Sequence, residues 1–455
     1  MATITSAQTG NFSDTATWVG GVVPGVGDDA VAATGHTVAI DVDVTVLSVQ
    51  QAGTGKFTLG NGRTLTANVI ANAGTFTSGG TVEVTATTTA AINGNVTGVS
   101  STAVNVAGVV VTGTGTVTVN GNVTGSLGNV SSEANGHAGV FTDVNCTLVV
   151  NGAVSGGTGA NKYGVRGGVN ATTASLTITG NVTGGGGSGA HGAFASGASA
   201  TVTITGNVTG GVGSNAHGAV ATGASATVTI TGNVTGGGAS NAHGAFATGA
   251  SASLTITGNV TGVGSSAHGA VASGASASLT ITGNVTGGGG SGAYGAYGQG
   301  ASSLVTVIGT VTGVNANSNG IRSDATSSGF GVLVSGNFID SPGGVTAIST
   351  RFMRIIETSP SGVTQYANNV NFPNGTLVSR VSPDLTTGMA AQADVRDNTV
   401  YGYNGELTGS LAVPPANSVA SGVPVDNTTG TAALSPADVA ALVGAQIAAA
   451  LDSTP

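Results

Sequence analysis

Apolar and polar residues alternate in five copies of one unit between residues 175 and 303. In the second copy, TVTITGNVTGGVGSNAHGAVATGASA, Val202 and Ile204 share one face of a five-residue segment and threonines occupy the other. This period of two is typical of a strand with one buried face. A helix is not expected, because Gly recurs every few residues and costs roughly 1 kcal/mol relative to Ala there. Each copy therefore predicts a strand, a turn and a second short strand at HGAFA.

The copies follow one another at a nearly constant distance along the chain. The asparagine of each GNVTG motif stands at 181, 207, 233, 259 and 284, so the steps are 26, 26, 26 and 25 residues. Such a period is typical of a solenoid in which each copy forms one coil. We therefore predict an all-β fold, a parallel β-solenoid of about 26-residue coils stacked at the usual strand spacing. One large apolar residue recurs in the second strand, and we expect it to point into the coil: Phe194, Val220, Phe246 and Val271.

The pattern changes at both ends of this rod. Residues 1–35, with Trp18 before Gly-Gly and Pro-Gly turn signals, predict an N-terminal cap, since an open solenoid end is an unpaired strand edge. Residues 36–345 predict the rod, which is most regular over 175–303. The repeat then stops, and residues 346–433, with several prolines and Asn-Gly turns, predict a small module of strands and loops.

Residues 434–455 predict one short helix. Ser435 suits the N-cap position and Pro436 the first helical position. An isolated helix of this length is marginal in water, so we expect its apolar face to serve in assembly or docking. That face is the row Val439, Val443, Ile447 and Leu451.

Composition supports a thin rod and argues against nucleic-acid binding. The chain of 455 residues has 81 glycines, 4% aromatic and 6% charged residues, which does not describe an ordinary globular core. The net charge of -9 is uneven, because no acidic residue stands between Asp143 and Asp324, and only Lys162 and Arg166 are basic before Arg322. Nucleic-acid binding is therefore not expected, since it depends on clustered Lys and Arg.

The remaining sequence signals concern compartment. The first residues lack the charged and apolar regions of a signal peptide, and no apolar stretch approaches the roughly 20 residues of a membrane span. We expect synthesis and folding in a cytoplasm and no membrane span. The single cysteine, Cys146, is expected to be a small buried apolar residue.

Two segments carry a resemblance to proteins of tailed phages. The opening GNFSDTATWVGGVVPGVGDDAVAATGHTVAID resembles the N-terminal module of β-helical proteins found in tailed-phage particles and on bacterial surfaces. The closing YGYNGELTGSLAVPPANSVASGVPVDNTTGTAALSPADV resembles the ends of virion structural proteins, fibres especially. The resemblance implies a phage fibre or spike, usually homotrimeric, that is carried on the virion and meets the host surface. It carries no functional residue over to a numbered position.

Histidines occupy the same place in four successive copies, with Tyr163 before them and a tyrosine after them. We predict a ladder of rings at about strand spacing, which serves as a structural stack or a ligand-contact surface. A pH-sensitive switch and a metal site remain alternatives. Metal-bound histidine usually has a second partner such as a carboxylate, which this region lacks, so no metal and no cofactor is expected. The ladder comprises His191, His217, His243, His268 and Tyr294.

Hydroxyl and amide side chains also recur in register. The central threonines of the strands, Thr203, Thr229, Thr255 and Thr280, predict a flat hydroxyl array that resembles the Thr-x-Thr faces of ice-binding solenoids. Thr is also a good outward strand residue, so a structural surface or a glycan platform is favoured. The asparagines of the NVT motifs match a glycosylation sequon, but an asparagine ladder that bonds along the axis at the turn is favoured.

No enzyme is predicted. Glycoside hydrolysis normally needs two carboxylates about 5 to 10 Å apart. The candidate acids Asp324, Asp340 and Asp384 stand only outside the regular repeats, with no spacing that pairs them. The glycine runs lack the Lys-Ser/Thr of a phosphate loop, and the repeats lack the Asp of calcium-binding coils.

The sequence therefore favours a structural protein of a tailed-phage virion, a β-solenoid fibre or spike that attaches to the host surface. Its expected partners are further copies of itself, as a homotrimer, other virion proteins, and a polysaccharide or protein of the host cell surface. A head-decoration fibre is the nearest alternative. A bacterial surface adhesin and an ice-binding solenoid are the others.

Overall fold

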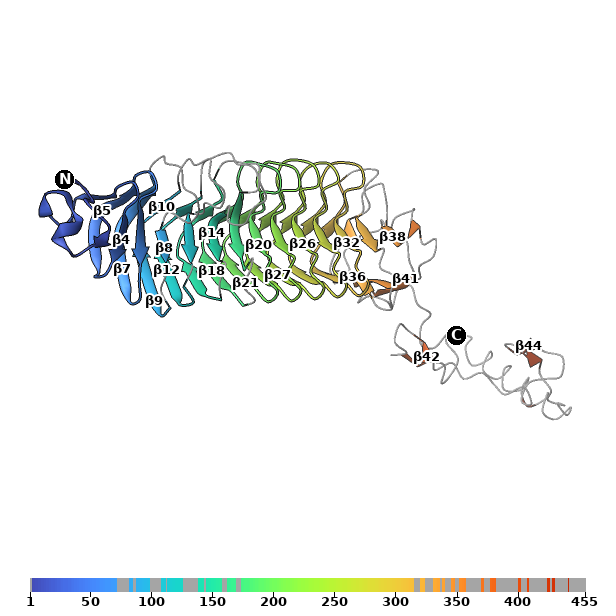
Figure 1. Cartoon of the computed structure of the whole chain (residues 1–455). Helices are drawn as coiled ribbons and strands as arrows, with labels where there is room; N and C mark the ends of the chain where they lie inside the picture. Colours follow the sequence, from blue (N-terminus) through green and yellow to red (C-terminus); the bar gives the residue numbers. More distant parts are fainter. Residues whose placement is uncertain are drawn as a thin grey trace, which may run out of the picture. The chain divides into compact units, whose positions relative to one another are not determined.

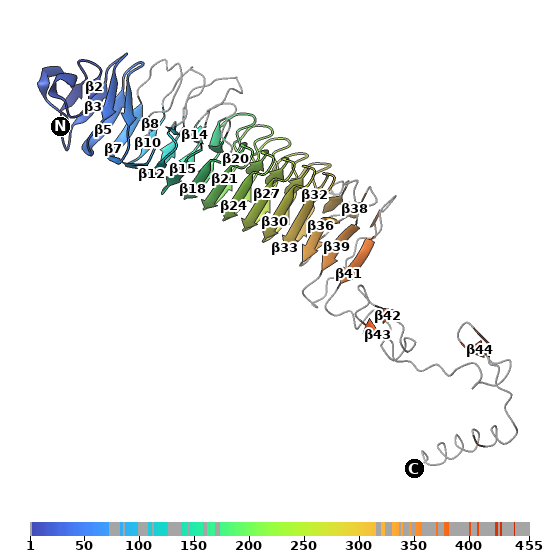
Figure 2. The same ribbon diagram turned by 60° about the horizontal axis from the view of Figure 1, so that its bottom comes forward.

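The structure is a computed structural model, and most of its described residues belong to one stack of parallel strands. Strands of successive coils lie side by side along one axis (Figures 1 and 2). The structure describes residues 2–71, 82–84, 87–98, 108–111, 113–125, 138–142, 145–157, 162–168, 173–314, 320–323, 330–335, 338–339, 345–347, 352–356, 370–371, 377–381, 400–401, 407–408, 424–425, 428–429 and 441.

The coils contribute to two sheets. The first, of 26 strands, has a column of longer strands and a column of two-residue strands; the second has 15 strands. Fourteen steps between 15 strands correspond to a stack about 67 Å long at ordinary strand spacing.

The longer strands of the first sheet are β1 (Thr3–Thr5), β3 (Asp29–Ala32), β5 (Val44–Gln51), β7 (Arg63–Ala71), β9 (Thr89–Asn93), β12 (Thr116–Asn120), β15 (Thr147–Val150), β18 (Ser175–Thr179), β21 (Thr201–Thr205), β24 (Thr227–Thr231), β27 (Ser253–Thr257), β30 (Ser278–Thr282), β33 (Leu304–Ile308), β36 (Phe330–Ser335), β39 (Phe352–Ile356) and β41 (Leu377–Val381). Its two-residue strands are β10 (Val96–Thr97), β13 (Val123–Thr124), β16 (Val154–Ser155), β19 (Val182–Thr183), β22 (Val208–Thr209), β25 (Val234–Thr235), β28 (Val260–Thr261), β31 (Val285–Thr286), β34 (Val311–Thr312) and β37 (Phe338–Ile339). The second sheet comprises β2 (Gly10–Asn11), β4 (Thr37–Ile40), β6 (Lys56–Leu59), β8 (Val82–Val84), β11 (Val109–Val111), β14 (Ala138–Thr142), β17 (Tyr163–Gly167), β20 (Ala193–Ala195), β23 (Ala219–Ala221), β26 (Ala245–Ala247), β29 (Ala270–Ala272), β32 (Ala296–Gly298), β35 (Ile321–Ser323), β38 (Val345–Ala347) and β40 (Val370–Asn371).

The core is a continuous column of small and branched apolar side chains inside the coils. Val202 and Ile204 are fully buried and pair in register with Val228 and Ile230 of the next coil. Equal apolar residues therefore stand side by side along the stack and form one continuous core, which a single coil could not shield from water alone. The predicted parallel β-solenoid is confirmed.

A glycine and an asparagine make the corner between the two columns of the first sheet. Gly232 has φ 150°, and a Cβ there would lie 2.2 Å from the carbonyl oxygen of Gly206 in the preceding coil. Any side chain would therefore both strain the backbone and collide with it. This requirement explains why a glycine precedes the asparagine in each regular copy.

The stack extends beyond both predicted boundaries of the rod. β1 pairs with β3, so the segment predicted as a separate cap already contributes strands to the stack. Trp18 is buried at this end of the core, and its Nε1 donates a hydrogen bond to the carbonyl oxygen of Phe12 at 2.8 Å. The 3-10 helices η1 (Thr15–Thr17) and η2 (Val19–Gly21) flank Trp18. At the other end, β36 pairs with β39 and β39 pairs with β41, although the sequence repeat has already ended there. Parallel pairing needs suitable apolar alternation, not identical residues, so the coils continue where the repeat does not.

The chain divides into two units, Met1–Pro383 and Asp384–Pro455. The second contains the antiparallel pairs β42 (Val400–Tyr401) with β43 (Leu407–Thr408), and β44 (Pro424–Val425) with β45 (Thr428–Thr429). Of the predicted terminal helix, Ala441 is described and is helical. Val439, Val443, Ile447 and Leu451 lie outside the described residues.

Candidate functional site

The predicted ladder of rings is present, and its members stand two residues before successive strands of the second sheet. The ring centroids of His191 and His217 are 4.9 Å apart, and the next two histidine pairs, reaching His243 and His268, are each 4.7 Å apart. The ring of Tyr294 continues the stack at 4.8 Å with an interplanar angle of 7°. These spacings equal the strand spacing of the sheet, so the ladder follows directly from the in-register pairing.

Backbone hydrogen bonds fix the protonation state of these rings. The N–H of His217 donates to Nδ1 of His191 at 3.1 Å, and the N–H groups of His243, His268 and Tyr294 each donate to Nδ1 of the preceding ring at 2.9 Å. A nitrogen that accepts a hydrogen bond carries no proton, so the neutral ring has its proton on Nε2. The ladder therefore contains four neutral imidazoles of the same tautomer.

Burial reinforces the neutral form. It lowers the pKa of His191 to about 3, that of His243 to about 4 and that of His268 to about 3. His217 is 7% exposed, and its pKa is lowered furthest, by burial first and then by the neighbouring histidines. A protonated ring would lose its Nδ1 hydrogen bond and repel its neighbours, so the ladder stays uncharged at neutral pH.

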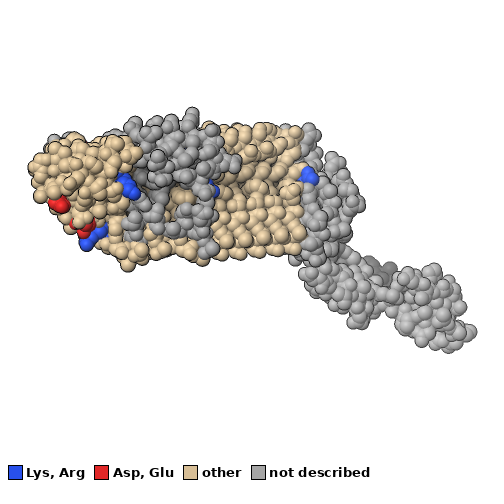
Figure 3. Space-filling view, in the orientation of Figure 1, with Lys and Arg blue, Asp and Glu red and all other residues tan. Residues whose placement is uncertain are grey.

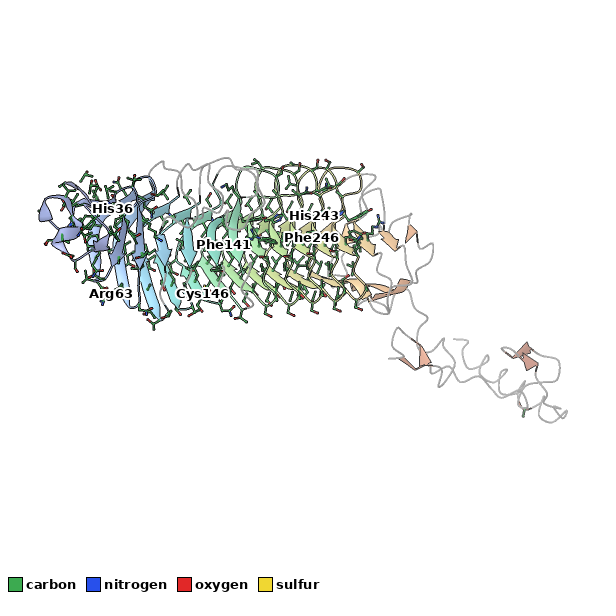
Figure 4. All side chains as sticks on the ribbon, viewed as in Figure 1. His36, Arg63, Phe141, Cys146, His243 and Phe246 are labelled. Atoms are coloured by element: carbon green, nitrogen blue, oxygen red, sulfur yellow. The ribbon has the colours of Figure 1, made fainter. Side chains whose placement is uncertain are left out.

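A second column of mainly aromatic and branched side chains runs beside the ladder. The alanines that flank each member, such as Ala193 and Ala195, belong to the main core of the described coils, but the central residues do not. Successive residues of a strand point to opposite faces, so the central residues lie on the outer face. There the rings of His243 and Phe246 meet edge to face with centroids 5.2 Å apart (Figure 4). The prediction that these side chains point into the coil is therefore wrong. The column is Phe194, Val220, Phe246, Val271 and Tyr297; together with the ladder we call it the aromatic strip.

An arginine covers each end of the aromatic strip. The guanidinium carbon of Arg166 lies 5.0 Å from the ring centroid of Tyr163, and that of Arg322 lies 5.0 Å from Tyr294 and 5.3 Å from Tyr297. Arg322 also donates a hydrogen bond to the Tyr294 hydroxyl. Both contacts have cation–π geometry. Sequence reasoning missed this role, although the motif Tyr-Gly-Val-Arg of residues 163–166 stands where the next four copies have His-Gly-Ala-Phe or His-Gly-Ala-Val.

The threonines of the predicted hydroxyl array also lie next to one another. Thr203 pairs with Thr229, Thr229 with Thr255, and Thr255 with Thr280 in consecutive coils. Their neighbours Val202 and Ile204 point inward, so the threonines line the outer face of the first sheet. An adjacent row, Thr205, Thr231, Thr257 and Thr282, is exposed.

The predicted asparagine ladder bonds along the axis, as expected. Oδ1 of Asn207 accepts the backbone N–H of Asn233 at 2.9 Å, and Asn233 and Asn259 repeat this bond in the following coils. Each side chain thus satisfies a backbone donor at the corner, where the strand ladder is interrupted. This accounts for the asparagine of the repeated NVT motif.

Two further side chains are buried near the start of the regular coils. Cys146 is 4% exposed and free, and burial raises the pKa of its thiol to about 11, as expected for a small buried residue. Lys162 is fully buried, and burial lowers its pKa to about 8.

The regular part of the rod carries no charged side chain. Residues 173–314 contain no Lys, Arg, Asp or Glu, and their surface in Figure 3 is uniformly uncharged. Within the described residues, no cluster of three His, Cys, Asp or Glu side chains is placed to hold a metal ion. Asp324, Asp340 and Asp384 lie outside the described residues. In the described part of the chain, no helix is long and apolar enough to cross a membrane.

Comparison with known proteins gives no relative. No protein-family model matches the chain, and neither a curated protein nor a solved structure matches it significantly.

Proposed function

We propose that the protein is a structural component of a tailed-phage virion, a β-solenoid fibre or spike that attaches to the host surface. The observation that carries the proposal is the run of in-register coils over residues 173–314, which contains no Lys, Arg, Asp or Glu and carries hydroxyl rows on one face and rings on another. Such a rod spans distance and offers the same contacts repeatedly. The resemblance of the two end segments to virion proteins supports the same function.

Recognition of glycan fits this surface better than recognition of nucleic acid. Sugars present hydroxyl groups and apolar ring faces, whereas nucleic acid requires clustered positive charge. Sites repeated along a rigid rod gain affinity by avidity without any strong single contact. In this function, assembly as a homotrimer, contact with other virion proteins, and location on the particle are parts of the same proposal. A head-decoration fibre would use the same surfaces at another place on the particle.

Ice binding is the second candidate, because one observation favours it. Thr203, Thr229, Thr255 and Thr280 are register partners in consecutive coils, with an exposed row of threonines two residues further along each strand. A hydroxyl array with a constant repeat would match a repeating lattice. The variants Thr229→Val and Thr255→Val would then abolish inhibition of ice recrystallisation by the purified protein. If the unaltered protein does not inhibit recrystallisation, this candidate is excluded.

The proposed virion location has a direct test. Antibodies raised against the recombinant rod would be applied to phage particles induced from the bacterium that carries the gene and viewed by electron microscopy with gold labels. We expect labels on a fibre, a spike or the head of the particle. Labels on the surface of uninduced cells, with none on particles, would overturn the proposal in favour of an adhesin.

The expected homotrimer is tested separately by light scattering on the intact protein and on a chain truncated before Ser435. A trimer that dissociates on truncation would support assembly through the terminal segment. A monomer in both cases would refute the homotrimer.

A further inference from the structure

The N-terminal end of the stack is the edge of a strand. β1 pairs with β3 along one edge, and within the described residues no strand pairs with its other edge. Strand edges readily bind other chains, because their N–H and C=O groups lack partners. The core at this end is closed by Phe12 and Trp18, whose ring centroids are 4.9 Å apart. What this end offers to other molecules is therefore the surface of the first coils, outside a finished core.

One short loop on this surface exposes three valines. Val19, Val22 and Val26 are 60%, 58% and 83% exposed, and we call residues 19–26 the valine loop. Single exposed apolar side chains are ordinary on a protein surface, but a group of them marks a contact surface. In the regular coils, by contrast, Val212 is exposed singly. The apolar surface of the described chain is thus concentrated at the N-terminal end.

The valine loop is held in place from inside. Val23 packs against the core and Pro24 is buried. The backbone N–H of Asp28 donates to the carbonyl oxygen of Gly25 at 3.0 Å, and the Asp28 carboxylate accepts from the N–H of Gly25 at 3.2 Å. A loop that is already ordered loses little conformational entropy when its exposed side chains are covered. The valines are therefore suited to contact with another molecule.

The same end of the stack is negatively charged. Residues 2–71 contain five aspartates, no glutamate and two cations, Lys56 and Arg63, so their net charge is -5 + 2 = -3. Asp14 and Asp43 are exposed and accept hydrogen bonds from backbone N–H groups, and within the described residues neither forms an ion pair. Figure 3 shows acidic side chains at this end of the rod. A partner that brings positive charge would therefore be favoured.

This charge decides between two occupants of the surface. Two copies of the chain that met end to end would bring their aspartates together, and like charges across an interface are destabilising. We propose that the N-terminal end of the stack is a docking surface for a different protein, whose contact area combines apolar side chains with Lys or Arg. The inference rests on the proposed function and names the site and the chemistry of the contact with another virion protein. The valine loop fills the apolar part of that contact, and Asp14 and Asp43 attract its cations.

The test uses phage particles from a bacterium in which the gene has been deleted from the prophage and the full chain is supplied from a plasmid. Particles are purified on a density gradient, and the protein bound per particle is measured by quantitative immunoblot. We expect Val22→Ser with Val26→Ser to reduce the bound protein about tenfold, because two side chains at the contact become polar. The matched control Val212→Ser, at a valine that is 71% exposed between β22 and β23, should leave the amount unchanged.

The charge of the partner is tested by Asp14→Asn with Asp43→Asn, which keeps the side-chain oxygen that accepts each backbone N–H. We expect about threefold less bound protein, since the attraction to Lys or Arg is lost. An unchanged amount would refute the proposed partner chemistry. Light scattering on the purified unaltered protein tests the other occupant. End-to-end association that Val22→Ser with Val26→Ser abolishes would assign the surface to a second copy and overturn the inference.

The outcome on particles separates this inference from the proposed function. Circular dichroism of each variant establishes that the coils are intact. If the unaltered protein is absent from the particles, the proposed function fails and this inference fails with it. If the unaltered protein is present and the variant with both serines is bound equally well, this inference alone is refuted.

Discussion

Acid should unfold the regular coils well above the pH at which the folded histidines titrate. The folded pKa values of His191, His243 and His268, about 3 to 4, lie below the ordinary value of 6.5, mainly because of burial. The unfolded chain therefore binds more protons than the folded chain between these limits. The contribution of the neutral histidines to the free energy of unfolding is therefore complete above pH 6.5 and is lost as the pH falls towards about 4.

The size of the effect follows from the difference in proton binding. At about pH 5.5, an unfolded histidine is roughly 90% protonated while the folded ring is neutral, which costs the folded state about 1.4 kcal/mol relative to the unfolded state. The four rings of the ladder together lose about 6 kcal/mol on this basis. Domains are typically stable by about 5–15 kcal/mol, so the loss is a large part of the total.

The assay is urea unfolding followed by far-ultraviolet circular dichroism at about pH 7.5 and about pH 5.5. The control carries tyrosine at positions 191, 217, 243 and 268, because Tyr163 and Tyr294 already occupy the equivalent place in the flanking coils. We expect the unfolding midpoint of the unaltered protein to fall strongly with acid and that of the control to change little. If both proteins lose equal stability, carboxylates elsewhere dominate and the account of the ladder is refuted.

Three other perturbations probe the corner and the core. Gly232→Ala should lower the free energy of unfolding by about 2 kcal/mol or more, because φ is 150° and the new Cβ would meet a backbone carbonyl. The control Gly238→Ala should be close to neutral, because no atom lies within 4 Å of the new Cβ. Thermal unfolding compares the two variants. Asn233→Ala should cost about 1 kcal/mol by leaving the N–H of Asn259 without its acceptor, and Asn233→Asp, which keeps that acceptor, should cost less in urea unfolding. The Cys146 thiol should not react with a thiol reagent at about pH 8 until the chain is unfolded, since burial raises its pKa to about 11; reaction of the folded protein would contradict this.

The candidate surfaces were predictable to different degrees. The rings at 191, 217, 243 and 268 and the threonines at 203 and 229 had to align once the coils were in register, because a constant period places equal residues above one another. Their hydrogen bonds were not predictable, since the contact between Nδ1 and the N–H of the next coil depends on the path of the backbone before β23. The arginines at the ends of the strip were visible only as rare charges.

The sequence by itself determined the coil. Alternation in TVTIT, the repeated Gly-Asn corner and the constant period leave one way to bury the apolar face, which is to stack equal strands in parallel. Tertiary structure alone decided which side of AFA faces inward. The alternation of a strand places Phe194 and its alanine neighbours on opposite faces, but it does not say which face points into the coil. The small alanines fit the closely packed interior of the coil, and the phenylalanine finds its partners on the outside, where the ladder supplies rings. The structure also shows that the stack extends to Val381, because backbone pairing continues after the sequence repeat has ended.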